Sequence, residues 1–506
     1  MRRFLSGLLI LIAITALFFP TPAGAQNPKR EFRGAWLHVI GQTQWQNKNV
    51  AQQKKYIEEQ FDLLLDAGCN AVIFQVRPTA DALYISELEP WSRWLTGRRG
   101  LAPNPLWDPM EYAIEQAHKR GMEFHAWLNP YRVTSNSSDA LPADHLSNTE
   151  PHRFVKFNNQ IFFDPAYPEN RDFICEIVKD IVNRYDVDGI HIDDYFYPYP
   201  ANGKKFNSDD ESYKKFGEGM ERNAWRRHNV DLLIEQLSST IHEEKPWVRF
   251  GVSPFGIWRN KSSDPRGSNS SGLQNYDDLY ADVLLWAQNG WIDYLAPQLY
   301  WTLDMKAAPS RHLAEWWNDN SHGVDVYIGQ DVQRTMTNAD PGNKDKNELD
   351  TKVKLSRKLP NVKGNIWWHG YWVTENLNGV ADSLALKYQS TIALPPEYGN
   401  RDHKPAKVKN LKLKKDNGRV FLTWDKVSID EDEMRTTDPI RFVVYQFFPD
   451  EKIDIEDAEA IIALTPYNTV LVEDASEGPS AEGSTFVVTA LDRMNRESEA
   501  VTIKWK

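Results

Sequence analysis

The residues best suited to chemistry form an acidic cluster near the middle of the chain, Asp188-Gly-Ile-His-Ile-Asp-Asp-Tyr195. Apolar Ile190 and Ile192 alternate with polar residues there, which is typical of a strand with one apolar face. The alternation places Asp193 on the polar face at the strand's end. Hydrolysis of a glycosidic bond needs an acid that protonates the departing oxygen and a second group that supports an oxocarbenium-like centre. Asp193 is a candidate for either role.

The second catalytic group has two candidates. Asp194 follows Asp193 directly and is a candidate partner, although it could equally orient a neighbour or pair with Arg77. Asp331 closes the apolar segment Val-Tyr-Ile-Gly-Gln-Asp and has the same parity relative to its strand. We therefore take Asp193, Asp194 and Asp331 as candidate catalytic residues, and both a retaining and an inverting route stay open.

The elements that must position these carboxyls alternate between strand and helix eight times. Strands are predicted at 32–40, 70–77, 122–129, 189–194, 248–254, 292–300, 324–331 and 364–370, and helices at 50–67, 109–120, 169–185, 219–243, 276–289, 306–319, 346–358 and 379–390. An open doubly wound sheet would carry a glycine-rich phosphate turn after its first strand, and the sequence has none. The predicted fold class is α/β, as a (β/α)8 TIM barrel.

Barrels of this kind carry out catalysis at the carboxyl ends of their strands, so inward-pointing residues there are candidate substrate contacts. In each predicted strand one parity is apolar and is expected to face the helices, whereas the other carries polar and aromatic residues. A barrel interior built only for stability would favour Val, Ile and Leu. The predicted substrate-binding residues, which include neighbours in the adjoining loops, are Trp36, His38, Gln75, Arg77, His125, Trp127, Asn129, Tyr131, His191, Tyr195, Gln298, Tyr300, Trp301 and His369.

Histidines on four of the predicted strands raise a metal-assisted hydrolase or deacetylase as an alternative. His38, His125, His191 and His369 stand singly, without an H-x-H or carboxylate-bridging pattern. We therefore predict no metal and no other cofactor. The two cysteines, Cys69 and Cys175, are expected to be separate buried thiols.

Residues 1–25 have the pattern of a cleavable signal peptide, with Arg2 and Arg3 before an apolar run and Ala23-Gly-Ala25 at its end. The mature protein is thus expected to be extracytoplasmic, either periplasmic or secreted. No later stretch is long and apolar enough to span a membrane. The formal net charge of −12 argues against a nucleic-acid partner, and 19 Trp with 20 Tyr favour a glycan. The sequence does not indicate an oligomeric state.

A second domain is predicted after the barrel. Residues 28–395 form the barrel, the proline-rich stretch 396–406 forms a linker, and 407–506 carry short alternating strands with turn signals such as Asp416-Asn-Gly418. With Trp424 placed to enter a core, this part resembles a fibronectin type III β-sandwich. Phe486 stands where that family usually has a Tyr, so the corner hydrogen bond would be missing.

Four motifs, in order along the first four predicted strands, resemble the bacterial glycosyl hydrolase-like family long catalogued as a domain of unknown function. They are Glu31-Phe-Arg-Gly-Ala-Trp36, Phe74-Gln-Val-Arg-Pro78 with Asp81-Ala-Leu-Tyr84, His125-Ala-Trp-Leu-Asn-Pro-Tyr-Arg132, and Asp188–Tyr195. The resemblance covers roughly residues 28–395. It implies an extracytoplasmic glycoside hydrolase, and a divisome-localised member of the family cleaves peptide-free peptidoglycan strands. This chain departs from the lipoprotein members because it has no lipobox Cys, and it adds the second domain.

The fourth predicted strand is also similar to the chitinase pattern D-G-x-D-x-D-x-E. Asp188, Gly189 and Asp193 match, but Tyr195 stands where the pattern has its acid Glu. By this analogy Asp193 or Asp194 supplies the proton, and Gln298 and Tyr300 would hold a substrate N-acetyl group. The expected function is hydrolysis of N-acetylated glycans such as peptide-free peptidoglycan. The missing Glu keeps a non-catalytic glycan-binding protein as the alternative.

Overall fold

The structure is a computed structural model of the whole chain, and it describes residues 27–136, 139–399, 403–426, 435–474 and 481–505. The predicted signal peptide lies outside these residues. The chain divides into two compact units, Arg30–Pro396 and a C-terminal unit of Glu397–Lys506 joined by the stretch that ends at Lys29. The division at Pro396 falls inside the predicted linker.

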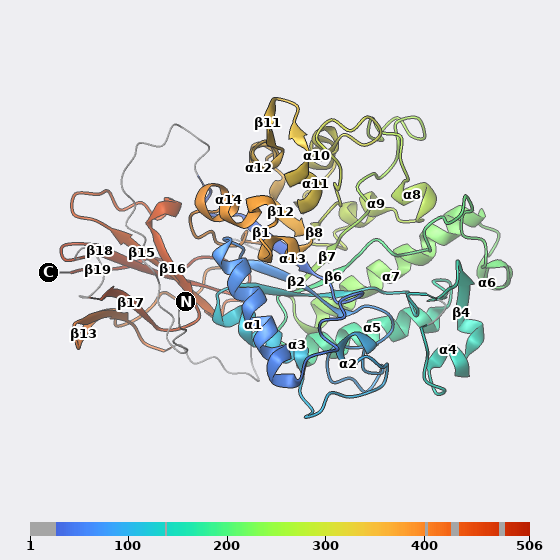
Figure 1. Cartoon of the computed structure of the whole chain (residues 1–506), viewed down its shortest axis with the longest axis horizontal. Coiled ribbons are helices and arrows are strands. Elements are labelled where there is room, and N and C mark those ends of the chain that lie inside the picture. Colours follow the sequence, from blue (N-terminus) through green and yellow to red (C-terminus); the bar gives the residue numbers. More distant parts are fainter. Residues whose placement is uncertain (1–26, 137–138, 400–402, 427–434, 475–480, 506) are drawn as a thin grey trace. The chain divides into compact units, whose positions relative to one another are not determined.

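The first unit is built around a closed barrel of eight parallel strands, all within described residues, which confirms the predicted fold class. Around the barrel the order is β1-β12-β9-β8-β7-β6-β3-β2. Each strand coincides with a predicted one, and the blue-to-orange colours in Figure 1 follow them in sequence order. The strands are β1 (Phe32–Leu37), β2 (Ala71–Arg77), β3 (Glu123–Leu128), β6 (Gly189–Ile192), β7 (Arg249–Val252), β8 (Tyr294–Leu295), β9 (Asp325–Asp331) and β12 (Val362–Trp368).

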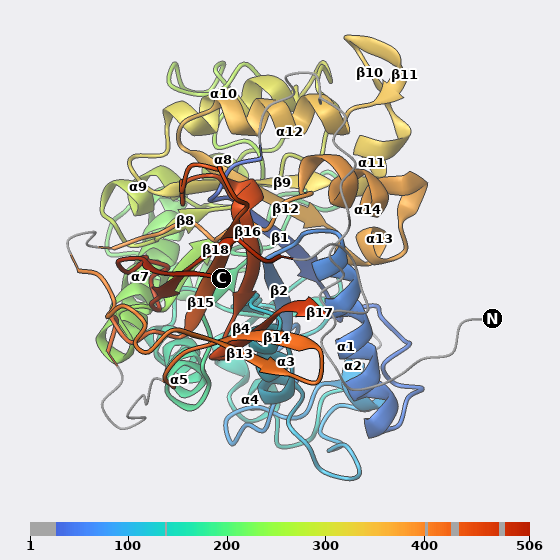
Figure 2. The same cartoon turned by 90° about the vertical axis from the view of Figure 1, so that its left-hand side faces the viewer.

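Helices surround the barrel (Figures 1 and 2). Two of them begin at clear side-chain caps: Asn49 and Gln52 form a capping box before α1, and Asp108 accepts the first free N–H groups of α3. The helices that follow successive strands are α1 (Val50–Asp66), α3 (Pro109–Lys119), α5 (Pro168–Arg184), α7 (Arg222–Glu244), α9 (Val283–Gln288), α10 (Ser310–Asp319), α12 (Leu349–Lys358) and α14 (Val380–Ser383).

Shorter elements lie in the connections between the barrel strands. They are α2 (Arg93–Thr96), α4 (Leu146–Thr149), the hairpin β4 (Phe154–Phe157) and β5 (Gln160–Phe163), α6 (Asp210–Phe216), α8 (Asn275–Asp278), α11 (Val332–Thr337), the hairpin β10 (Ala339–Asp340) and β11 (Asn343–Asn347), and α13 (Gly370–Thr374). Among the residues described, no helix has the length and apolar character needed to cross a membrane. Cys69 and Cys175 are buried free thiols, as predicted.

The C-terminal unit contains two small antiparallel sheets in its described residues. One has the order β13 (Lys412–Asp416), β14 (Arg419–Thr423), β17 (Thr469–Asp474), and the other β16 (Ile461–Thr465), β15 (Arg441–Phe447), β18 (Thr485–Leu491), β19 (Val501–Lys504). Trp424, Phe442, Val470 and Phe486 belong to one buried cluster that both sheets share. The all-β prediction is therefore confirmed, and the fibronectin type III assignment stays a prediction.

Lys29 completes the C-terminal unit from the other end of the chain. Its ammonium lies 2.7 Å from Glu497 and 3.1 Å from Glu456, and its side chain is only 5% exposed. The hydroxyls of Tyr445 and Thr489 also donate to Glu497.

Replacing Lys29 with Met is expected to lower the free energy of unfolding of this unit by about 1.5–3 kcal/mol, because Glu497 loses a buried charged hydrogen bond. Chemical denaturation of the full chain measures the effect. The matched control is Lys407→Met, whose partner Glu499 is 75% exposed, so the expected change is below about 1 kcal/mol. Equal effects of the two substitutions would contradict the assigned role of Lys29.

Candidate active site

Asp193 lies directly after β6, at the carboxyl end of the barrel, and three N–H groups bind its carboxylate. Trp127 Nε1 donates to Oδ2 at 3.0 Å and Asn129 Nδ2 to Oδ1 at 3.0 Å, both from the adjacent strand β3 and its end. The backbone N–H of Tyr195 donates to Oδ1 at 3.3 Å. Burial raises the pKa of Asp193, while the positive charge of Arg132 and these N–H donors act in the opposite direction.

Asp194 has a different environment, although it is the next residue. The Tyr199 hydroxyl donates to its Oδ2, and Gln298 also hydrogen-bonds to the carboxyl. Burial and the adjacent negative charge of Asp193 raise the pKa of Asp194 to about 7. Strand parity turns Asp194 outward unless the strand has already ended. The structure brings it together with Asp193 and the end of β8, because β6 ends at Ile192 and the alternation ends with it.

An aromatic cluster lies beside the two carboxyls, and Trp368 is at its centre. The ring of Trp368 stacks on Tyr300 at 5.9 Å and contacts Trp36 at 6.3 Å, Trp127 at 6.2 Å and His38 at 5.2 Å. The predicted residues Trp36, Trp127 and Tyr300 therefore do come together. Trp368 itself was missed, and the signal that could have found it is its place at the end of the eighth strand.

His125 and His191 lie deeper in the barrel, where protein groups occupy their ring nitrogens. Trp36 Nε1 donates to His191 Nε2 at 3.2 Å, and His191 Nδ1 lies 3.0 Å from the Tyr294 hydroxyl. That hydroxyl lies 2.8 Å from His125 Nδ1, and His125 Nε2 lies 3.2 Å from Glu123. Both rings are fully buried, so they support Trp36 from below. Their predicted contact with substrate has no support in this geometry.

Two glycines leave the space that these hydrogen-bonded side chains occupy. A Cβ at Gly251 would lie 1.9 Å from the Tyr294 ring, and a Cβ at Gly189 would lie 2.5 Å from His125 Nδ1. Any larger residue would displace these rings, because both strands contribute inward positions of the barrel. The glycines therefore permit polar rings where barrels commonly place aliphatic side chains.

Gln75 and Arg77 were predicted to contact substrate, but the guanidinium of Arg77 and the amide oxygen of Gln75 bind protein groups, whereas Gln75 Nε2 is buried without a hydrogen-bond partner among the described residues. Gln75 Oε1 accepts the backbone N–H groups of Val39 and Ile40 at 3.0 and 3.1 Å. Arg77 donates two 2.6 Å hydrogen bonds to Glu89, and it also donates to the Asn129 carbonyl. The two residues therefore hold the backbone around the mouth in place. Gln75 binds the segment after β1, and Arg77 positions Asn129, which binds Asp193.

Some of the remaining predicted residues lie at the mouth of the barrel, and others are buried or cap a helix. Asp331 is the N-cap of α11, where its carboxylate accepts a hydrogen bond from the backbone N–H of Arg334 at 2.8 Å. This helix was not predicted, and capping it is the role that the structure shows for Asp331. Tyr131 is fully buried beyond the end of β3. His369 follows β12, stacks against Trp372 at 4.0 Å and lies 5.0 Å from His38. Tyr195, Gln298 and Trp301 are partly exposed at the ends of β6 and β8.

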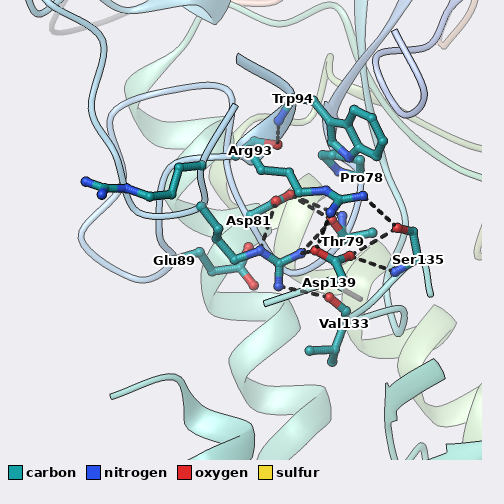
Figure 3. A network of polar contacts seen from close by, with 12 residues as sticks. Pro78, Thr79, Asp81, Glu89, Arg93, Trp94, Val133, Ser135 and Asp139 are labelled. Atoms are coloured by element: carbon teal, nitrogen blue, oxygen red, sulfur yellow. Dashed lines mark hydrogen bonds and ion pairs between the residues drawn. The ribbon is translucent and has the colours of Figure 1, made fainter. Parts of the chain in front are cut away.

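A buried polar network joins the loop after β2 to the loop after β3, both of which flank the mouth (Figure 3). Arg99 lies 3.3 Å from Asp81 and 3.5 Å from Asp139, and donates to Thr79 Oγ1 and the Val133 carbonyl. Burial raises the pKa of Asp81 to about 6 against the opposing charge of Arg99. The network links the loop after β2 to the segment that follows Asn129.

No group of three or more His, Cys, Asp or Glu side chains in the described part of the chain could hold a metal ion. Burial lowers the pKa of both His38 and His369 to about 4. His38 Nε2 lies 2.8 Å from the side-chain amide of Gln42. These two imidazoles are therefore neutral at neutral pH, and Nδ1 of each is buried without a hydrogen-bond partner in the part of the chain that the structure describes.

Comparison with known proteins gives a consistent picture of relatedness. A family model described as glycosyl hydrolase-like 10 matches residues 31–346. The chain is 37% identical to glycosyl hydrolase YngK of Bacillus subtilis over 98% of this chain and 97% of that protein. It is 40% identical to glycosyl hydrolase DigH of Escherichia coli K12 over 59% of this chain and 72% of that protein.

Solved structures with similar architecture include the glycoside hydrolase domain of PgaB from Bordetella bronchiseptica. It has 11% sequence identity and a TM-score of 0.45, and the match covers 71% of this chain and 98% of that one. The catalytic domain of a β-amylase from Paenibacillus polymyxa has 10% identity and a TM-score of 0.45, over 72% of this chain and 98% of that one.

Proposed function

We propose a substrate and a mechanism for this chain, which belongs to the glycosyl hydrolase-like 10 family and is a glycoside hydrolase. The barrel mouth hydrolyses N-acetylated glycans, and peptide-free peptidoglycan strands are the proposed substrate. The resemblance of the strand motifs to a family with that activity supports the substrate. The N-terminal signal pattern supports an extracytoplasmic location, where such strands occur.

One observation carries the mechanism: two adjacent buried carboxyls have different environments. Asp193 accepts three N–H groups, which stabilise its ionised form. Asp194 lies beside that negative charge, which favours its protonated form. Carboxyl pairs whose surroundings separate their protonation states commonly divide the roles of acid and charged partner. Asp194 is therefore the proton donor to the departing oxygen, and Asp193 is the ionised group that stabilises developing positive charge.

The aromatic cluster supplies the place for the sugar at the cleavage point. Trp368 and Tyr300 stack on each other beside the carboxyls, and both are partly exposed. Burial, and then the negative charge of Asp194, raises the pKa of Tyr300 well above its ordinary value. Tyr300 and Gln298 are the groups proposed to hold an N-acetyl substituent there.

Product analysis tests the proposal. The mature protein is incubated with peptide-free peptidoglycan strands and, separately, with chitin oligomers, and products are identified by mass. Release of oligosaccharides from the strands by the wild type, but not by Asp193→Asn, is the expected result. Cleavage of chitin oligomers alone would contradict the peptidoglycan substrate, and full activity of Asp193→Asn would contradict the mechanism.

The pH dependence follows from the raised pKa of Asp194. A general acid must carry its proton, so kcat/KM is expected to fall as pH rises through about 7. Tyr199→Phe removes a hydrogen bond that stabilises the ionised form of Asp194. Its pKa should rise further, and the alkaline limb of the pH profile should move to higher pH. A limb that moves to lower pH would contradict the assignment of Asp194 as the acid.

A further inference from the structure

Four aromatic rings contact one another in succession beside Asp194, at the mouth of the barrel. Tyr199, whose hydroxyl donates to Asp194, contacts Tyr195 on one side at 5.3 Å and Phe255 on the other at 6.4 Å. Phe255 contacts Trp301 at 5.4 Å. We refer to Tyr195, Tyr199, Phe255 and Trp301 as the aromatic row.

The row is assembled from the carboxyl ends of three successive strands. Tyr195 and Tyr199 follow β6, Phe255 follows β7, and Trp301 follows β8. A parallel bridge between Phe255 and Gln298 fixes the β7 end against the β8 end. Because Gln298 also binds the Asp194 carboxyl, the row is continuous with the proposed proton donor.

Every ring of the row keeps part of its surface accessible. Tyr195 is 37% exposed with one face covered by the Arg132 guanidinium at 4.6 Å, and the other three rings are partly buried. Apolar rings of this size are buried when they serve only packing, as Trp258 and Trp286 are. Accessible rings at the mouth of a catalytic barrel therefore indicate a ligand.

The ring planes fit a chain of sugars better than one flat molecule. Successive rings are inclined to each other by 54°, 69° and 77°. The ring planes therefore change direction along the row, and successive sugars of a linked glycan likewise present apolar faces in different directions. Aromatic faces bind such apolar faces by burial and dispersion.

We propose that the aromatic row binds several consecutive sugars beside the cleaved bond, so that the enzyme acts within polymeric glycans and discriminates by chain length. This inference rests on the proposed function for the identity of the glycan, but not for the existence of the row.

Binding of an oligomer ladder tests the row without requiring cleavage. In an Asp194→Asn background, calorimetry measures the dissociation constants of chitin oligomers from the disaccharide to the hexasaccharide and of peptide-free peptidoglycan strands. Affinity is expected to increase with chain length. Phe255→Leu and Trp301→Leu, which keep apolar volume but lose the ring, should each weaken binding of the longest ligands about two- to tenfold.

Two sets of variants keep the test decisive. Phe255→Tyr and Trp301→Phe retain a ring and should retain most of the gain with length, which separates stacking from misfolding. Trp91→Leu removes a partly exposed ring from the loop after β2, outside the row, and should leave the length dependence as it is. The row is refuted if both Leu variants keep the parental length dependence, or if no ligand binds more tightly as it lengthens. Failure of the proposed function is a separate result: length-dependent binding together with no products from the wild type.

Discussion

Replacing Asp194 with Asn is expected to lower kcat on glycan strands by about 10²- to 10⁴-fold, the usual contribution of a positioned general acid. The amide keeps the size of the side chain and a hydrogen-bonding oxygen for Tyr199, but it has no acidic proton to transfer. Release of reducing ends at a pH below 7, where the wild-type carboxyl is protonated, measures the effect.

The control for Asp194→Asn is the same substitution at Asp186, a 45% exposed carboxyl before the start of β6. Asp186→Asn should keep wild-type kcat. If Asp194→Asn instead stays active while Asp193→Asn does not, the proton donor is Asp193 and the division of roles between the two carboxyls is wrong.

Arg77→Met is expected to lower the free energy of unfolding of the barrel by about 3–5 kcal/mol, the typical effect of removing one partner of a buried ion pair. Arg77 is 1% exposed and Glu89 is 3% exposed, so the remaining carboxylate would have neither solvent nor a counter-charge. Denaturant unfolding followed by intrinsic fluorescence gives the change. The variant should also lose activity, because Arg77 holds the carbonyl of Asn129.

The double variant Arg77→Met with Glu89→Met serves as its control. Replacing both members of a buried pair with apolar residues is often neutral, so most of the lost stability should return. Activity should not return with it, because the hydrogen bond to Asn129 is still missing. An Arg77→Met protein as stable as the wild type would show that the pair is worth no more than an exposed one.

The barrel was predictable because its strands and helices differ in period, and the pattern repeats eight times. Interruptions within single helices could not be predicted in this way. The predicted helix 276–289 is divided into α8 and α9, since Tyr280 adopts a positive φ of 55° and Asp282 starts a new helix as its cap. In the C-terminal unit, the alternating segments 420–424, 442–448 and 486–491 predict strands, and they coincide with β14, β15 and β18. The strands β16, β17 and β19 were missed. The first two carry the short apolar runs Ile461-Ile-Ala-Leu464 and Val470-Leu-Val472 in place of an alternating pattern, and β19 has only four residues.

Strand parity located the carboxyls but not every neighbour. It correctly placed Trp36, Trp127 and Asp193 together, because each lies within a strand or one residue beyond its end. From strand parity we predicted His369 as an inward residue in place of Trp368. The inward positions of β12 are Ile366 and Trp368, and the strand ends one residue before His369.

Parity also gives no information about partners that come from loops. Glu89 lies twelve residues after Arg77 in a connection without a regular pattern, so their pairing could not be read from either residue alone. Asp331 was in phase with its strand but begins the short helix α11, and a cap has the same sequence signature as a strand-end carboxylate.

A buried series of hydrogen bonds runs from Trp36 through His191, Tyr294 and His125 to Glu123. Its donors and acceptors can be arranged in only one direction when both imidazoles are neutral. An indole N–H can only donate and an ionised carboxylate can only accept, so the two ends determine every hydrogen in between. His191 must carry its proton on Nδ1 and His125 on Nε2, with the Tyr294 hydroxyl turned toward His125. Burial also lowers the pKa of His191 well below its ordinary value. With both imidazoles neutral, this is the single arrangement of protons that satisfies every hydrogen bond at the centre of the barrel.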